Sequence, residues 1–203
     1  MVPHSQLTFR HRWPTSQFEL GYVDERREDR DLRGVLWARC GQNPLNRRGM
    51  LTGEPRWLEM HPLRQRECML RLRCQVCVRP AKTPLGWVFL APPDWTSPHR
   101  TLEITHQPPV CARHIRPSVT FCPALDGHPR VYLVQRAPLY GVEGYLYGYG
   151  ADGIDVVADT PDFALPYGHT NLTTFLASKL IRRFTDFRLV DLQELVKSLE
   201  GAA

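Results

Sequence analysis

The stretch Cys74-Gln75-Val76-Cys77 is matched, thirty-three residues later, by Cys111-Ala112-Arg113-His114. A Cys-x-x-Cys turn directs two sulfurs at one point, and a Cys-x-x-His pair completes a tetrahedron of thiolate and imidazole ligands, which is the set that zinc prefers. Four protein ligands leave no open coordination position, so such an ion is structural rather than catalytic. We therefore predict a structural Zn²⁺ site with four ligands: Cys74, Cys77, Cys111 and His114.

Three alternative roles for these cysteines fit the sequence less well. Four unrelated core thiols would account for one Cys-x-x-Cys, but not for two half-sites that bracket a predicted pair of strands. A redox Cys-x-x-Cys needs a thioredoxin-like βαβ context, which is missing here. Three disulfides would suit a small secreted chain, but Met1-Val2-Pro3-His4-Ser5 does not begin a signal peptide, so we do not expect secretion.

Three cysteines lie outside the predicted site, at Cys40, Cys68 and Cys122. They could join a histidine such as His61 in a second metal site. A free cysteine is more often a small buried hydrophobic residue. We therefore predict that these three are core residues, and the sequence gives them no further role.

The residues around the two half-sites have recognisable local patterns. Pro62 suits the first position of a helix, and good helix formers continue to about residue 73, directly before Cys74. Residues 86–90 read as a strand, and the alternating residues 101–105 read as its partner. This strand pair would fold back and bring the two half-sites together.

The remaining chain has a different pattern. Three further strands are predicted over residues 130–136, 142–149 and 154–158, the last two joined by a hairpin at Asp152-Gly153. Two C-terminal helices are predicted. The first covers residues 171–184, which place apolar residues on one helical face. The second runs from Asp191 to about Glu200, and Asp191 and Glu194 give it a capping-box-like start. The first 24 residues read as an irregular or extended arm.

Together these elements predict an α+β fold in one domain spanning residues 1–203. A treble-clef-like zinc module over about residues 62–123 would pack with an antiparallel β-meander and C-terminal helices over about residues 130–200. The apolar runs are too short for a bilayer-spanning helix, so we expect no membrane partner and a cytoplasmic location.

Positive charge is concentrated in one part of the chain. The formal net charge is +5, while residues 26–79 alone hold thirteen Arg and six acidic residues. Such a stretch attracts phosphate polymers or acidic proteins, although a solvated helical face that binds nothing has the same composition. The candidate nucleic-acid contacts flank the first half-site: Arg64, Arg66, Arg71 and Arg73.

The order of Cys-x-x-Cys turn, hairpin and second ligand pair at the head of a possible helix resembles a treble-clef zinc module. Its spacing is similar to that of the zinc-stapled HNH endonucleases, which use a His, often in an Asp-His or His-His pair, as general base, with Asn and a further His at a catalytic metal. Between Cys77 and Cys111 this chain has only His99 and His106, no Asn and no such pair. The resemblance therefore implies the scaffold without the catalytic residues. A wider run, from His61-Pro62-Leu63 to Cys122-Pro123, resembles a group of actinobacterial proteins and implies no particular activity.

These observations predict a non-catalytic, zinc-stabilised binding protein that contacts nucleic acid through its Arg-rich face. Two alternatives stay open. The chain could be an accessory module that binds an acidic protein partner, or a divergent HNH-type metal-dependent nuclease that uses His99 or His106. We expect a protein that is not an enzyme, and the sequence does not indicate its oligomeric state.

Overall fold

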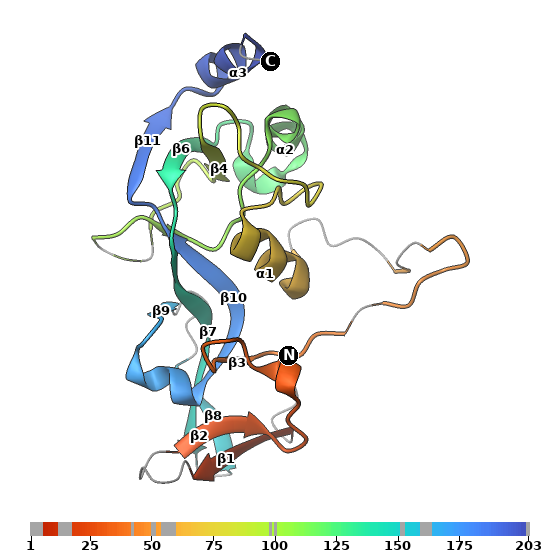
Figure 1. Cartoon of the computed structure of the whole chain (residues 1–203), viewed down its shortest axis with the longest axis vertical. Coiled ribbons are helices and arrows are strands. Elements are labelled where there is room, and N and C mark those ends of the chain that lie inside the picture. Colours follow the sequence, from red (N-terminus) through yellow and green to blue (C-terminus); the bar gives the residue numbers. More distant parts are fainter. Residues whose placement is uncertain are drawn as a thin grey trace. The chain divides into compact units, whose positions relative to one another are not determined.

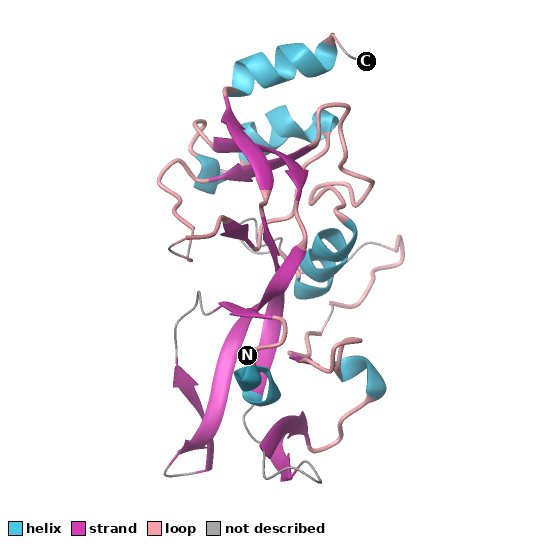
Figure 2. Cartoon of the chain, turned by 60° about the vertical axis from the view of Figure 1, so that its left-hand side comes forward, coloured by secondary structure: helices cyan, strands magenta, loops and turns pink. Residues whose placement is uncertain are grey.

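The computed structural model describes residues 6–11, 18–41, 43–49, 52–53, 60–97, 99, 101–150, 153–158 and 164–201. Helices and strands are both present, and nearly all the strand pairs are antiparallel, which confirms the α+β class (Figures 1 and 2). The chain divides into two compact units, one of residues 1–54 and 141–179, the other of residues 55–140 and 180–203. The single domain over residues 1–203 stays a prediction. None of the described helices is long and apolar enough to cross a membrane.

The first unit is mostly β-structure. Its elements are β1 (Leu7–His11), β2 (Phe18–Tyr22), β3 (Leu36–Trp37), most of β7 (Leu139–Gly150), β8 (Gly153–Ala158), β9 (Ala164–Pro166) and the start of β10 (Phe175–Arg183), with 3-10 turns at Arg27–Asp29 and Thr170–Thr174. The residues expected as an N-terminal arm instead pair as an antiparallel hairpin, β1 with β2, whose inner side chains join a core with Leu36 and Tyr147. The pairing of Gly150 with Gly153 confirms the predicted β7–β8 hairpin, whose turn residues 151 and 152 lie outside the described residues.

The predicted helix over residues 171–184 is wrong. A short 3-10 turn at Thr170–Thr174 leads into strand β10, which lies between β3 and β7 in its sheet. Apolar residues that share one face of a helix also suit a strand that is buried on both sides, and Phe175, Leu176 and Ala177 are all buried in succession. The β7 backbone approaches closely at Gly144, where an added Cβ would lie 2.1 Å from the carbonyl oxygen of Leu176.

The second unit contains the predicted metal ligands. Its elements are α1 (Pro62–Arg71), β4 (Trp87–Ala91), β5 (Ile104–Thr105), a 3-10 turn at Ala112–His114, α2 (Ile115–Phe121), a 3-10 turn at Pro123–Leu125, β6 (Arg130–Arg136), β11 (Asp186–Val190) and α3 (Leu192–Glu200). The predicted starts of α1 and α3 are confirmed: Pro62 is the first helical residue of α1, and the Asp191 side chain accepts hydrogen bonds from the first turn of α3.

The predicted pairing of residues 86–90 with 101–105 is wrong. Strand β4 pairs with β6 in the sheet β11–β6–β4, whereas β5 pairs with the end of β10. The chain returns to β4 later than predicted, at Val110, whose N–H donates to the Val88 carbonyl over 2.9 Å. This return places Cys111 beside β4. The two half-sites therefore come together as predicted, but through the pairing of Val110 with Val88.

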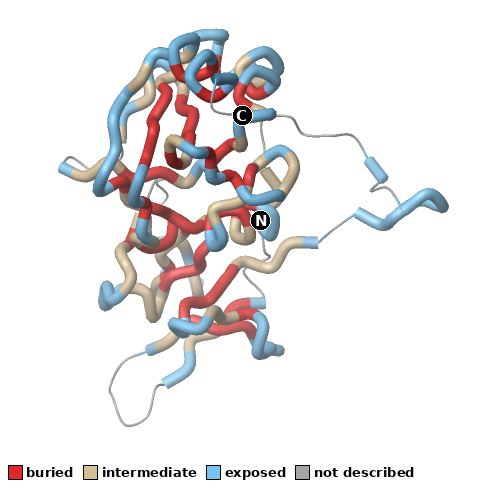
Figure 3. The backbone as a smooth tube through the Cα atoms, turned by 45° about the horizontal axis from the view of Figure 1, so that its top comes forward, coloured by how far each residue is buried: buried red, intermediate tan, exposed pale blue. Residues whose placement is uncertain are grey.

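Both faces of strands β4 and β6 are covered, whereas the edge strand β11 is largely exposed. Val88, Leu90, Val131 and Leu133 face a core that includes Cys74, α2 and α3, while Phe89, Tyr132 and Val134 face a second core with Phe184. Successive side chains of β4 and β6 point to opposite faces of the sheet, so this one strand pair contributes residues to both cores. Residues 88–91 of β4 and 131–134 of β6 are buried, and Figure 3 shows the buried stretches of the chain in red.

Two buried polar side chains tie α1 to β10. The Gln65 amide donates to the Leu180 carbonyl over 2.9 Å and accepts from the Leu180 N–H over 3.0 Å. The Arg182 guanidinium donates to the carbonyls of Met69, Leu70 and Ala137. It therefore satisfies two oxygen atoms left free where α1 ends and a third in the segment that follows β6. Burial lowers the pKa of Arg182 to about 10, which still leaves the side chain charged at neutral pH.

Replacing this buried guanidinium should weaken the second unit. We expect Arg182→Met to lower the free energy of unfolding by about 3 kcal/mol, because three carbonyls lose a charged donor. Urea unfolding followed by circular dichroism measures the effect. Arg183→Met is the matched control, since the neighbouring Arg183 side chain takes no part in these three hydrogen bonds. Equal losses in both variants would contradict the assigned role.

Candidate metal centre

A tight turn shapes the first half-site. The Cys74 N–H donates to the Arg79 carbonyl over 2.8 Å, and the Val78 N–H donates to the Cys74 carbonyl over 2.8 Å. Val78 has φ of 60°, a left-handed conformation that a β-branched residue rarely adopts. Leu72, which ends α1, is also left-handed, with φ of 50°. Such strain persists only where the surrounding contacts determine the backbone.

Two of the predicted nucleic-acid contacts hold this turn in place. Arg64, on α1, donates to the carbonyls of Gln75 and Val76, with 3.0 Å from its Nε to Gln75. Arg73 donates to the Val78 carbonyl over 3.1 Å. The side chains of these two arginines therefore supply hydrogen-bond donors to three carbonyl oxygens of the Cys74–Val78 turn.

The other two predicted contacts have different surroundings. Arg71 is exposed and lies 3.5 Å from the Glu67 carboxylate, which also lies 3.4 Å from Arg73. Arg66 is half-buried on the same helix. All four arginines thus belong to α1 or the two residues after it, and Glu67 offsets part of their charge.

The second half-site follows directly from the return of the chain to β4. Its Cys111 comes next after Val110, and the Gln75 N–H donates to the Pro109 carbonyl over 2.9 Å, which joins the two half-sites through their backbones. A 3-10 turn then presents His114, whose N–H donates to the Cys111 carbonyl over 2.8 Å. Helix α2 begins at Ile115, so Pro117 lies in its first turn, where a missing N–H costs no helical hydrogen bond.

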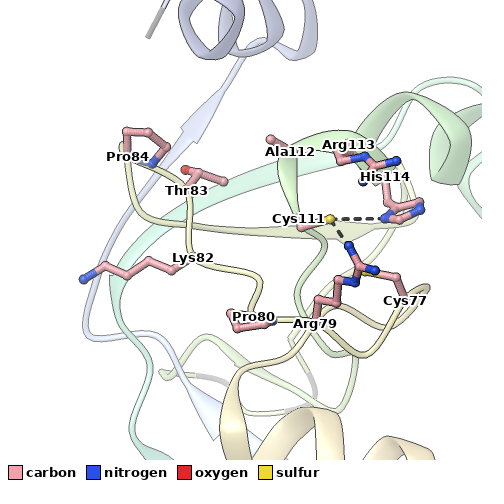
Figure 4. A pocket seen from close by; sticks show the side chains of 10 residues that line it. All are labelled: Cys77, Arg79, Pro80, Lys82, Thr83, Pro84, Cys111, Ala112, Arg113 and His114. Atoms are coloured by element: carbon pink, nitrogen blue, oxygen red, sulfur yellow. Dashed lines mark hydrogen bonds between the residues drawn. The ribbon is translucent and has the colours of Figure 1, made fainter. Parts of the chain in front are cut away.

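The four predicted ligands converge. The three cysteine Sγ atoms and a nitrogen of His114 all lie within 4.8 Å of one another. The Cys77 and Cys111 sulfurs are 3.9 Å apart, and His114 Nδ1 is 3.7 Å from the Cys74 sulfur and 3.1 Å from the Cys111 sulfur. A tetrahedral ion bonded at about 2.3 Å to sulfur and about 2.05 Å to nitrogen requires about 3.8 Å between two sulfurs and about 3.6 Å between a sulfur and the nitrogen. The donor set therefore fits a metal ion, and Figure 4 shows Cys111 facing His114.

The thiols themselves favour a divalent cation between them. Burial, followed by the negative charges of Cys74 and Cys77, raises the pKa of Cys111 to about 11. Burial also opposes ionisation of Cys77, but the N–H of Arg79, the neighbouring thiols and the Arg79 charge outweigh it and lower the pKa of Cys77. This role of Arg79 was not predicted from the sequence, although its position two residues after a ligand was a usable signal. A cation among the sulfurs would replace their mutual repulsion with attraction.

The remaining cysteines do not form a second cluster. Cys68 is buried, with its sulfur 3.6 Å from the Cys74 carbonyl, and burial raises its pKa. Cys122 packs against the core that contains Cys74, whereas Cys40 is half-buried in the first unit. The imidazole of His61 accepts from the Leu63 N–H at the start of α1. Across the described residues, the only group of three or more potential ligands is the one at Cys74.

The two histidines considered for nuclease chemistry lie in different surroundings. His99 Nδ1 accepts from the Thr101 N–H over 3.3 Å, and its ring lies edge-on to Tyr140. The backbone carbonyl of His106 accepts from the Gln65 amide over 2.7 Å. Neither residue belongs to the ligand cluster.

Comparisons with protein-family models, with curated proteins and with solved structures find no match to this chain. The function must therefore be inferred from the geometry of the cluster and its surroundings.

The left-handed backbone at Val78 gives a direct test of the turn. We expect Val78→Gly to raise the free energy of unfolding of the metal-bound protein by about 1 kcal/mol, because glycine adopts this conformation without steric cost. Thermal unfolding at matched metal content measures the change. Val78→Ala keeps a Cβ and should give a smaller gain, so an equal gain for alanine would mean that loss of the branched side chain, not backbone strain, is responsible.

Proposed function

We propose that this chain is a non-catalytic, zinc-stabilised protein that binds nucleic acid through the Arg-rich surface of α1 and the adjoining turn. The single observation that carries the proposal is the convergence of Cys74, Cys77, Cys111 and His114. Three thiolates and one imidazole suit a borderline-soft tetrahedral dication, of which zinc is the usual occupant in proteins. When bound, zinc would cross-link the two half-sites and supply folding free energy.

The placement of the ligands supports a structural role. Cys74 is fully buried in a core with Val88, Val110 and Ile115, so the site is continuous with the hydrophobic interior. A Cys-x-x-Cys turn, a returning chain and a second ligand pair at the head of α2 support a treble-clef-like module over about residues 62–123. Thiols can bind a metal only while they are reduced, and cysteines stay reduced in the cytoplasm. A zinc site of this kind therefore supports a cytoplasmic location.

The α1 surface offers charge that is already positioned. Arg64 is exposed, and its hydrogen bonds to two carbonyls fix the guanidinium without neutralising it. Arg71 is also exposed on the same helix. Fixed guanidinium groups lose little conformational entropy when they meet a phosphate, and their planar donors match its oxygens. Nucleic acid therefore fits this surface as a partner.

Removal of the metal tests the structural part of the proposal. We expect native mass spectrometry to find one Zn²⁺ per chain and a chelator to unfold the second unit, because the buried thiols then lose the cation that holds them together. Cys77→Ser should abolish metal retention, while Cys122→Ser, a half-buried cysteine outside the cluster, should retain it. A chain that keeps its fold and its melting temperature after chelation would overturn the structural role.

Charge removal on α1 tests the choice of partner. We expect Arg66→Gln/Arg71→Gln to weaken binding of a short duplex or single-stranded oligonucleotide about tenfold and to reduce the slope of log affinity against log salt by about 1–2. Arg64 and Arg73, which hold the Cys74–Cys77 turn, stay in place, so metal content should not change. Glu67→Gln should strengthen binding, because its carboxylate lies beside Arg71 and Arg73.

The control for this experiment is Arg47→Gln/Arg48→Gln, which removes two exposed charges from the first unit. Fluorescence anisotropy between about 50 and 200 mM salt provides the measurement. Equal losses in both double variants would indicate a non-specific charge effect. Undetectable or salt-insensitive binding by the unmodified protein would remove nucleic acid as the partner.

A further inference from the structure

The metal centre opens onto a pocket of about 510 Å³. The pocket lies between the segment that follows the first half-site and the second half-site (Figure 4). Its lining residues are Cys77, Arg79, Pro80, Lys82, Thr83, Pro84, Cys111, Ala112, Arg113 and His114. Three of the four metal ligands therefore form part of the pocket wall.

The pocket is strongly cationic. Arg79, Lys82 and Arg113 line it, and none of the described lining residues is acidic. All three side chains are exposed, and within the described part of the chain no ion pair joins any of them to a carboxylate. Lys82 lies over the Trp87 ring, 5.1 Å from its centroid, a contact that leaves the ammonium charge in place.

The bound metal would leave this charge in excess. Three thiolates, one dication and a neutral imidazole sum to a single negative charge, whereas the pocket supplies three positive ones. A net surplus of two positive charges remains next to a concave surface. An anion carrying one or two negative charges matches that surplus.

The walls of the pocket are fixed by the backbone. Thr83 and Gly86 exchange backbone hydrogen bonds of 2.9 and 3.2 Å, and the Thr83 hydroxyl donates to the Gly86 carbonyl over 2.7 Å. Pro80 and Pro84 restrict the chain on either side of Lys82. The threonine hydroxyl is thus committed within the turn, so the cationic side chains are the groups that remain to hold an anion.

We propose that this pocket is a phosphate-binding subsite, and that the phosphate it takes belongs to the backbone of a nucleic acid. The second half of this statement rests on the proposed function. Arginine donates to phosphate oxygens in pairs, so Arg79 and Arg113, which lie beside the metal ligands in Figure 4, suit a tetrahedral oxyanion. Lys82 extends away from these two arginines, so its ammonium adds a point charge for a neighbouring phosphate of the same backbone. The subsite would extend the Arg64–Arg73 surface to residues that no sequence motif marks.

The metal centre would also organise this subsite. Arg79 follows Cys77 by two residues, and Arg113 directly precedes His114, although the two arginines are far apart in sequence. A metal ion that joins the two half-sites fixes the spacing between these cations. Phosphate binding should therefore depend on bound metal, even though the phosphate makes no bond to it.

The test uses the full metal-loaded chain and two probes, inorganic phosphate and a short oligonucleotide. The pocket variant is Lys82→Gln/Arg113→Gln, with Lys82→Gln alone as a second variant, because Lys82 is not adjacent to any ligand whereas Arg113 directly precedes His114. The matched control is Arg47→Gln/Arg48→Gln. Native mass spectrometry establishes that each variant retains its metal before binding is compared.

We expect phosphate to raise the melting temperature of the unmodified protein and of the control relative to chloride at equal ionic strength, and to leave the pocket variant unchanged. For the oligonucleotide, the pocket variant should bind about tenfold more weakly, with a salt slope smaller by about 2, and Lys82→Gln should show about half of that change in slope.

The outcomes separate the subsite from the proposed function. If the pocket variant binds the oligonucleotide as the unmodified protein does, while Arg66→Gln/Arg71→Gln binds weakly, the subsite is overturned and the proposed function stands. If the unmodified protein binds no oligonucleotide, the proposed function and the backbone assignment both fail. A pocket-dependent effect of inorganic phosphate would then support a free-phosphate site, and its absence would overturn the subsite altogether.

Discussion

The close approach of three cysteine sulfurs, which repel one another when ionised, is the constraint around which the ligand-bearing elements of the second unit are arranged. Cys74, Cys77 and Cys111 meet at a partly buried point, where burial and the neighbouring thiolates raise the pKa of Cys111 to about 11. Protonation or a shared cation relieves this repulsion, and the imidazole of His114 completes a set that favours the cation. The elements that surround this point hold the thiols together: the turn between Cys74 and Val78, the return of the chain at Val110, and the start of α2.

Several arginines near this point stabilise the backbone by donating hydrogen bonds to carbonyls, a role that the concentration of charge in the sequence did not indicate. Arg64 and Arg73 donate to carbonyls of a turn that contains a left-handed valine, and Arg182 donates to carbonyls where α1 ends. A guanidinium can do this because it offers several donors in one plane. These hydrogen bonds leave the positive charge unchanged, so a structural role and a phosphate-binding role are compatible in the same side chain. A lysine ammonium also carries three donors, but they radiate from a single nitrogen, so it would not reproduce the planar, spaced donors of the guanidinium.

The sequence predicted those features that depend on neighbouring residues. Pro62 and Asp191 mark the starts of α1 and α3, because each acts within one helical turn. The ligand set follows from two local spacings. The errors involve partners distant in the chain: residues 171–184 read as a helix because their apolar side chains share a helical face, but β10 lies between β3 and β7, where both faces of a strand are buried. Similarly, residues 101–105 have the alternation of a strand without any indication that β5 would pair with β10.

The cationic pocket illustrates why a surface formed by residues distant in the chain can escape prediction from sequence. Arg79, Lys82 and Arg113 form no motif, and Lys82 is one of only three lysines in the chain. They share one pocket because the two half-sites meet, and the hydrogen bond from Val110 to Val88 brings residues 111–114 back beside the segment that follows Cys77. Any agent that separates the half-sites would separate these charges as well. The positions of these charges in the second unit are in this respect a consequence of the convergence of the two half-sites, since the same backbone that brings Cys77, Cys111 and His114 together also places Arg79 and Arg113.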